Sequence, residues 1–190
     1  MSEVKDIIVK TVITGQPQLA HLYKSCQPEC LDNSMCFQVL GFDVLIDSKF
    51  KPYLLEVNAS PSFGTDSSLD YKIKKNVLTD TFKLLNFSYA KRKHLIRDLQ
   101  EKTMERILTG KVNRISHEQR ERLRNEKLQE RFKFESTRMR GFELIYPSND
   151  RVKNQLYQKL ILKSNDIWDE FTTGKLKHRQ KVMEMQQKRQ

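Results

Sequence analysis

The sequence contains little of what disulfide scaffolds, membrane spans and phosphate-binding loops require. Its 190 residues include 3 cysteines, 6 glycines and 5 prolines, and 37% of them are hydrophobic. No apolar run approaches the roughly 20 residues of a membrane span, residues 1–15 lack the pattern of a secretion signal, and no glycine-rich phosphate loop is present. We therefore expect an intracellular, cytoplasmic protein that is not anchored in a membrane.

The three cysteines are Cys26, Cys30 and Cys36. Because they are odd in number and close together, they fit reduced thiols better than a disulfide framework. His21, Cys26 and Cys30 are an alternative set of zinc ligands, but no fourth residue follows at the spacing of a zinc finger. We interpret the cysteines as structural.

Charge is distributed unevenly along the chain. Residues 1–87 carry 9 Lys and Arg against 10 Asp and Glu, a net charge of −1, whereas residues 88–190 carry 26 against 14, a net charge of +12. The asymmetry predicts a nearly neutral folded part over residues 1–87 and a basic helical part over residues 88–174 that has few apolar positions. We expect residues 175–190 to form a disordered tail.

Residues 36–58 have the pattern of a β-hairpin. Residues 36–47 are rich in β-branched and aromatic residues, and residues 53–58 form a second apolar run. The segment from Asp47 to Pro52 has turn chemistry. The two runs should therefore pair antiparallel.

The register of this hairpin brings polar side chains together. If Asp47 and Pro52 close the loop, opposed residues have numbers that sum to 99, so Asp43 is opposite Glu56. Glu56 shares a face with Asn58 because side chains alternate along a strand.

Two carboxylates and an amide oxygen on one surface suit Mg²⁺, which prefers a few hard oxygen ligands plus the phosphates of a substrate. Asp43, Glu56 and Asn58 therefore predict a metal site that also binds a nucleotide. The alternative is that they only line the wet face of a half-exposed sheet. Apolar residues on both sides of the hairpin disfavour this alternative, because they place the acids in buried surroundings where an unpaired charge is costly.

Two stretches carry a family resemblance, GFDVLID at 41–47 and KPYLLEVNASPSFGTDSSLDYKIK at 51–74. They resemble the C-terminal part of the ATP-grasp ligase domain of the tubulin tyrosine ligase-like proteins, in particular the polyglutamylase branch. In that family an Asp thirteen residues before Glu-x-Asn holds the Mg²⁺ that bridges the ATP phosphates, and the matching positions are Asp43, Glu56 and Asn58. More loosely, the resemblance extends to about residue 174.

The resemblance implies an α+β fold: the C-terminal lobe of an ATP-grasp domain, with antiparallel strands and helices, followed by a basic and mostly helical extension. It implies ATP and Mg²⁺ as cofactors, free L-glutamate as the donor, tubulin in microtubules as the acceptor, and a cytoskeletal location at a cilium, basal body or axoneme. The acceptor carboxylate would become an acyl phosphate that the glutamate amino group attacks. Glu56 and Asn58 would be the catalytic residues, and with Asp43 they would hold the metal and ATP.

The segments around the hairpin predict helices. Residues 4–14 predict a short helix that ends in a turn at Gly15 and Pro17. After a Ser, Pro and Gly loop, Asp70 is expected to cap a helix that runs to Phe87.

Lys74 lies in the first turn of that second helix. The resemblance implies that Lys74 holds a carboxylate of the donor glutamate. A solvated lysine on an amphipathic helix is an equally good interpretation.

Helix signals also divide the second half of the chain. A helix over residues 89–108 ends before Gly110, and Ser116 with Gln119 forms a capping box for a helix that runs to Gly141. A third helix follows Pro147 and Ser148 and ends at Leu162, and a separate short piece contains Trp168 and Phe171.

The helix after Ser116 is strongly basic and has few apolar residues. A solvated face with Glu pairs is one interpretation, but the positive excess predicts an acidic partner, either tubulin or nucleic acid phosphate. No nucleic-acid-binding signature is present, so the family resemblance favours tubulin. The predicted microtubule-binding residues are Arg114, Arg120, Arg122, Arg124, Lys127, Arg131 and Lys133.

The resemblance also implies that the family's adenine pocket, phosphate-binding lysines and N-terminal lobe lie upstream of Met1. The prediction is therefore a ligase fragment that is inactive by itself. A noncatalytic microtubule-binding module is the alternative, and a basic nucleic-acid-binding protein is a more distant one.

Overall fold

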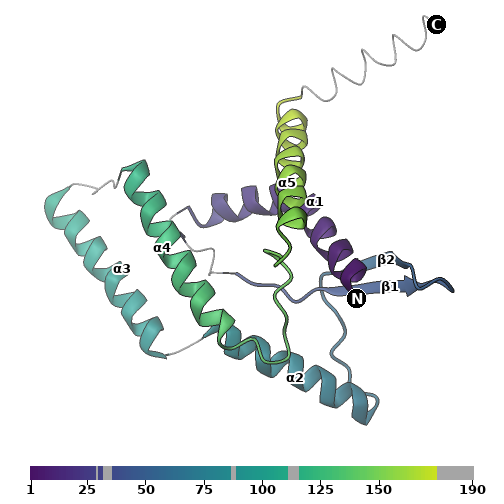
Figure 1. Ribbon diagram of the computed structural model, residues 1–190. Helices are drawn as coiled ribbons and strands as arrows, with labels where there is room; N and C mark the ends of the chain where they lie inside the picture. The colour runs from purple at the N-terminus through teal and green to yellow at the C-terminus, as the bar shows by residue number, and fades with distance from the viewer. Residues whose placement is uncertain (29, 32–35, 87–88, 111–115, 175–190) are drawn as a thin grey trace, which may run out of the picture. The chain divides into compact units, whose positions relative to one another are not determined.

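The computed structural model describes residues 1–28, 30–31, 36–86, 89–110 and 116–174 (Figure 1). These residues form the helices α1 (Ser2–Cys26), α2 (Ser68–Leu85), α3 (Tyr89–Thr109), α4 (His117–Ser136) and α5 (Arg151–Thr172), and the strands β1 (Gly41–Ile46) and β2 (Pro52–Asn58). The small antiparallel sheet among helices confirms the α+β class.

The chain divides into two compact units. The first contains residues 1–29, 37–61 and 144–190, and the second contains residues 30–36 and 62–143. The predicted boundary after Phe87 and the predicted tail over residues 175–190 fall on residues outside the described ones, so both stay predictions.

The first unit has its core between α1 and α5, which cross each other (Figure 1). Val9 and Ile13 of α1 are buried against Tyr157 of α5. Val9, Ile13 and the buried Pro17 recur at every fourth position, which places them on one face of α1. α1 also contacts β2, so this core supports the hairpin.

The predicted turn at Gly15 and Pro17 is wrong, because α1 continues through both residues to Cys26. A proline has no N–H to donate to the carbonyl four residues earlier, which here belongs to Ile13. The Ser164 hydroxyl of α5 donates to that carbonyl at 3.1 Å. A contact from a distant helix thus replaces the missing hydrogen bond.

A polar contact crosses the same interface. The Tyr157 hydroxyl donates to an Asp6 carboxylate oxygen at 2.9 Å, and Lys10 lies 2.6 Å from the other oxygen. Burial, together with this hydrogen bond, raises the pKa of Tyr157 to about 12. Burial also raises the pKa of Asp6, but the hydrogen bonds from Lys10 and Tyr157 outweigh it, so the net pKa is lowered.

The helix that follows the hairpin begins earlier than predicted. Ser67, not Asp70, is the N-cap of α2: its hydroxyl accepts the Asp70 backbone N–H at 3.1 Å and donates to the Asp70 carboxylate at 2.7 Å. Asp70 therefore supports the cap from inside the first turn. α2 ends at Leu85, and the next residue, Asn86, has a left-handed backbone with φ of +52°.

The end of α3 and the start of α4 follow the sequence signals. α3 ends before Gly110, whose φ is +61°. The capping box at Ser116 is confirmed, since Gln119 donates its backbone N–H to the Ser116 hydroxyl at 3.2 Å and accepts the Ser116 N–H at 3.0 Å.

Two other helix ends were predicted wrongly. α4 stops at Ser136, before Gly141, and a turn follows in which the Phe142 N–H donates to the Met139 carbonyl at 2.7 Å. α5 does not break after Leu162. No glycine or proline interrupts it there, and its contact with α1 continues to Trp168, whose ring centroid lies 6.1 Å from that of His21.

The Tyr157 contact predicts a measurable loss of stability. Tyr157→Phe removes a hydrogen bond to a carboxylate, so it should lower the free energy of unfolding by about 1.5–3 kcal/mol at neutral pH. Because the folded pKa is raised above the ordinary value of 10.0, this stabilisation is complete below pH 10 and is lost as the pH rises to about 12. Urea unfolding followed by the fluorescence of Trp168, the one tryptophan of the chain, measures both effects.

Tyr146→Phe is the matched control. The Tyr146 hydroxyl accepts a hydrogen bond from the exposed Gln158 amide at 2.8 Å, and its loss should cost less than about 0.5 kcal/mol. Equal losses of unfolding free energy in the two variants would contradict a stabilising role for the Tyr157–Asp6 hydrogen bond. So would a loss in Tyr157→Phe that stays the same at alkaline pH.

Candidate functional site

The hairpin places the predicted metal ligands as expected. β1 and β2 pair antiparallel, with Asp43 opposite Glu56 and Gly41 opposite Asn58. Closer to the turn the register differs by one residue, since Leu45 is opposite Tyr53.

The difference arises at the loop, which closes between Asp47 and Lys51 and not between Asp47 and Pro52. The Asp47 N–H donates to the Lys51 carbonyl at 3.1 Å. A β-bulge opposite the Asp43–Val44 step then absorbs one extra residue in β2. The predicted pairing of the site is right because these two one-residue shifts cancel.

Asp47 itself builds the turn. Its Oδ1 accepts the backbone N–H of Lys51 at 2.8 Å and that of Lys49 at 2.9 Å, and Tyr53 donates to its Oδ2 at 3.3 Å. These hydrogen bonds lower the pKa of Asp47 below its ordinary value. The loop is thus closed by a charged side chain that is not part of the ligand cluster.

Asp43, Glu56 and Asn58 converge. The Asn58 amide nitrogen donates to Glu56 Oε1 at 3.0 Å and lies 3.5 Å from Asp43 Oδ2. A hydrogen bond to Glu56 raises the pKa of Asp43, and hydrogen bonds to Asn58 and Asp43 lower the pKa of Glu56. The two carboxyl groups therefore lie around the same amide nitrogen.

The same geometry suits a hard cation, because a cation between two carboxylates offsets their mutual repulsion. The Asn58 amide turns its NH₂ group toward the carboxylates, and a half-turn of that group would present Oδ1 to a cation instead. These three side chains could thus supply two carboxylates and an amide oxygen to Mg²⁺. Water and phosphate oxygens would complete the coordination.

The predicted buried surroundings of the acids are wrong. Asp43 and Glu56 are exposed, and Asn58 is half-buried. Over the described residues the sheet has two strands, so apolar residues of the hairpin also face outward. Leu45 is 54% exposed and Leu55 is 63% exposed.

The residues that hold the loop after Asn58 were not predicted from the sequence. The Gln38 side chain donates to the Ala59 carbonyl at 3.0 Å. A Cβ on Gly41 would lie 3.1 Å from the Cβ of Pro61, so a glycine here lets the loop close against β1. The pairing of Gly41 with Asn58 was the signal that could have indicated this approach.

Lys74 lies in the second unit, on α2, and donates a hydrogen bond to the carbonyl of Gly64. With Thr65, Tyr71 and Lys75 it lines a hollow of about 300 Å³. Lys74 therefore orders the loop before α2, and its contact with a donor glutamate stays a prediction.

The predicted docking residues lie on α4, apart from Arg114, which is outside the described residues. Arg122 pairs with Glu118 and Arg131 pairs with Glu135, each at 2.6 Å. The solvated-face interpretation therefore holds for these two. Among the described residues, no acid pairs with Arg124, Lys127 or Lys133, all of which are exposed.

The other candidate sites are less developed. Cys26, Cys30 and Cys36 are not joined in a disulfide. The described part of the chain has no group of three His, Cys, Asp or Glu side chains that could hold a metal ion. The Asp43 cluster differs from such a group because its third ligand is an amide. Within the described residues, no helix combines the length and the apolar character that crossing a membrane requires.

Comparison with known proteins shows what the chain is similar to. The model of the tubulin-tyrosine ligase family matches residues 1–97. The chain belongs to this family. A "Probable beta-tubulin polyglutamylase" of Tetrahymena thermophila is 43% identical over 148 residues, which cover 78% of this chain. The human "Tubulin polyglutamylase TTLL6" is 36% identical over 192 residues, 99% of this chain, and the mouse "Tubulin polyglutamylase TTLL7" is 38% identical over 183 residues, 84% of this chain.

The chain spans only a small part of these relatives. The aligned region covers 12% of the Tetrahymena protein, 21% of human TTLL6 and 20% of mouse TTLL7.

The ligand cluster predicts a weak divalent cation site. Mn²⁺ added to the chain should broaden the NMR signals of Asp43, Glu56 and Asn58 first, and Mg²⁺ should compete. Glu56→Gln should weaken Mn²⁺ binding about tenfold, because it removes a charged ligand. Asp66→Asn, a matched change at an exposed acid of the following loop, should have no effect. If Mn²⁺ broadens the signal of Asp66 as much as those of the cluster residues, the cation site is excluded.

Proposed function

We propose that this chain supplies the metal-binding strands of an ATP-dependent ligase that adds glutamate to tubulin. The convergence of Asp43, Glu56 and Asn58 on one face of the hairpin supports this proposal. Membership of the tubulin-tyrosine ligase family and the names of the relatives supply the reaction class. Residues 1–87 would belong to an ATP-grasp lobe, and residues 88–174 would be its basic extension.

The reaction needs no covalent bond to the enzyme. The acceptor glutamate carboxylate takes the γ-phosphoryl group of ATP, ADP leaves, and the amino group of free glutamate displaces phosphate to form an amide. When bound, Mg²⁺ neutralises the phosphate charge that develops in both steps. Asp43 and Glu56 would hold the metal ion on the sheet face through their carboxylates, and Asn58 would add its amide oxygen.

Docking on tubulin would be the task of α4. Its exposed cations suit the acidic surface of tubulin, because complementary charge raises the rate of encounter and orients the partners. A cytoskeletal location, including a cilium, basal body or axoneme, follows from this proposal. The alternative of a microtubule-binding module without catalysis rests on the same helix alone.

Activity tests the metal-binding role. A longer protein that carries these residues together with a nucleotide-clamping lobe should incorporate labelled glutamate into tubulin when ATP and Mg²⁺ are present. Glu56→Gln in that protein should abolish incorporation, because it removes one of the two carboxylates that hold the metal charge. The 190-residue chain alone should show no incorporation.

Two results would contradict this assignment. Incorporation by the chain alone would show that the lobe is not required. Full activity of the Glu56→Gln protein would show that the hairpin is not the metal site. Asp66→Asn serves again as the control and should retain activity.

Microtubule docking should depend on the unpaired cations of α4. Reversing the charge of Arg124, Lys127 and Lys133 should weaken co-sedimentation of the chain with microtubules about tenfold. Reversal of Arg122 alone should have a smaller effect, since Glu118 already offsets its charge. Binding should weaken as salt rises, because charges are screened over about 8 Å at physiological ionic strength.

Competition with RNA separates the two acidic partners. If single-stranded or duplex RNA binds more tightly than microtubules at matched salt, and the triple reversal affects RNA binding more, the tubulin assignment of α4 is wrong.

A further inference from the structure

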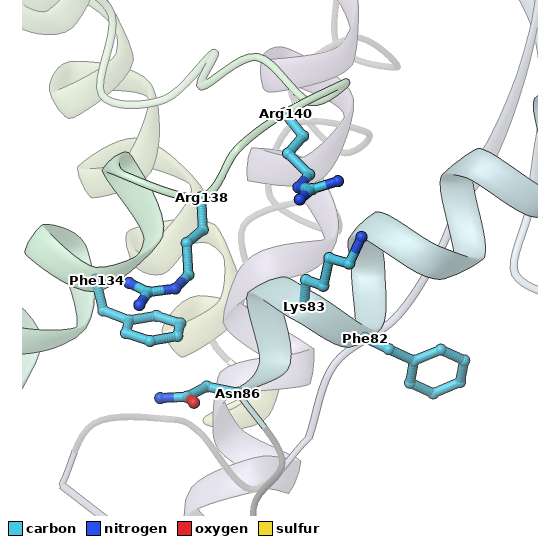
Figure 2. A pocket seen from close by; sticks show the side chains of 6 residues that line it. All are labelled: Phe82, Lys83, Asn86, Phe134, Arg138 and Arg140. Atoms are coloured by element: carbon cyan, nitrogen blue, oxygen red, sulfur yellow. The ribbon is translucent and has the colours of Figure 1, made fainter.

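The second compact unit contains a basic hollow that the proposed function does not use. Its volume is about 370 Å³. Part of its wall comes from the C-terminal end of α2, and part comes from the end of α4 and the turn that follows (Figure 2). The lining residues are Phe82, Lys83, Asn86, Phe134, Arg138 and Arg140, and none of them is acidic.

Two of the three cations of the basic hollow point toward each other, and the third lies against an aromatic ring. Figure 2 shows the Lys83 ammonium and the Arg140 guanidinium extending toward each other, with the Arg138 guanidinium beside the Phe134 ring. The Arg138 Cζ lies 4.0 Å from the centroid of that ring, a distance at which the ring face attracts the cation.

These cations differ from the paired cations of α4. Among the described residues, no carboxylate forms an ion pair with Lys83, Arg138 or Arg140, whereas Arg122 and Arg131 each have one. Like charges that gather in a concave surface repel each other unless an anion lies between them.

The backbone fixes Arg140 in place. The adjacent Gly141 donates its N–H to the Asp80 carboxylate of α2 at 3.2 Å, and a Cβ on Gly141 would lie 3.1 Å from that oxygen. Arg140 itself has a φ of +47°, a left-handed backbone that is unfavourable for arginine. Such strain is typical of positions where a side chain has a function.

We propose that the basic hollow binds a small anion that carries two or more phosphate charges. Three cations around one hollow exceed the single charge of a carboxylate. Consecutive side chains of an extended acidic peptide point to opposite sides, so a hollow of this size receives one of its carboxylates at a time. A compact phosphate-type anion presents its oxygens in several directions, so it can contact cations from both α2 and the turn after α4.

Calorimetric titration of the 190-residue chain with inorganic pyrophosphate tests the proposal. EDTA in the buffer keeps divalent cations from the Asp43 cluster, so the result does not depend on the metal-binding role. We expect one saturable site, and we expect Lys83→Ala and Arg140→Gly each to weaken binding about fivefold or more. Since glycine adopts a positive φ without cost, Arg140→Gly should not lower the thermal unfolding temperature.

Lys72→Ala is the matched control, because Lys72 is an exposed lysine of the same helix, eleven residues before Lys83. Its pyrophosphate affinity should equal that of the unchanged chain. Titration with ADP separates two sources of the anion. If ADP binds more tightly than pyrophosphate and depends on Lys83 and Arg140, the anion is the phosphate group of a nucleotide. If ADP binds more weakly, the anion is a free phosphate compound.

Three results would overturn the proposal. Binding that does not saturate, or an equal loss in Lys72→Ala, would show diffuse attraction to a basic surface. Tighter binding of a glutamate oligopeptide that depends on Lys83 and Arg140 would show that the basic hollow takes peptide carboxylates. None of these results bears on incorporation of glutamate, which is measured with Mg²⁺ and tubulin.

Discussion

The antiparallel pairing of β1 with β2 is the constraint on which the candidate metal site depends. It sets Asp43 against Glu56, two like charges that would separate if their strands were not hydrogen-bonded. Asp47 closes the turn, a β-bulge restores the register, and the loop after Asn58 packs against Gly41. Backbone geometry thus imposes a proximity that the two charged side chains alone oppose, and the proposed cation would offset their repulsion.

Packing of α1 against α5 supports this hairpin from the same unit. α1 contacts β2, and α5 holds α1 through apolar contacts, the bond from Ser164 to the Ile13 carbonyl and the bond from Tyr157 to Asp6. The helix that comes last in the described chain therefore stabilises the one that comes first. The family model matches residues 1–97 and therefore does not include α5, although α5 forms the core of the first unit together with α1.

Positive charge in the second half has more than one use. Part of it is offset within α4, as the pairs of Arg122 and Arg131 show, and part is exposed along the same helix. A third part gathers around the basic hollow, where α2 and the turn after α4 meet. Net charge per segment could not separate these uses, because it counts residues and ignores which of them share a surface.

The sequence by itself determined features that depend on near neighbours: the hairpin and its pairing of Asp43 with Glu56, the cap at Ser116, the end of α3 at Gly110, and the family. Tertiary structure decided what depends on distant ones. From its neighbours in sequence alone, Pro17 predicts the end of a helix, yet contact with α5 keeps α1 continuous. Exposure of Asp43 depends on how many strands flank it. The basic hollow depends on two separate segments, residues 82–86 and 134–140, because folding and not chain order sets which surfaces meet.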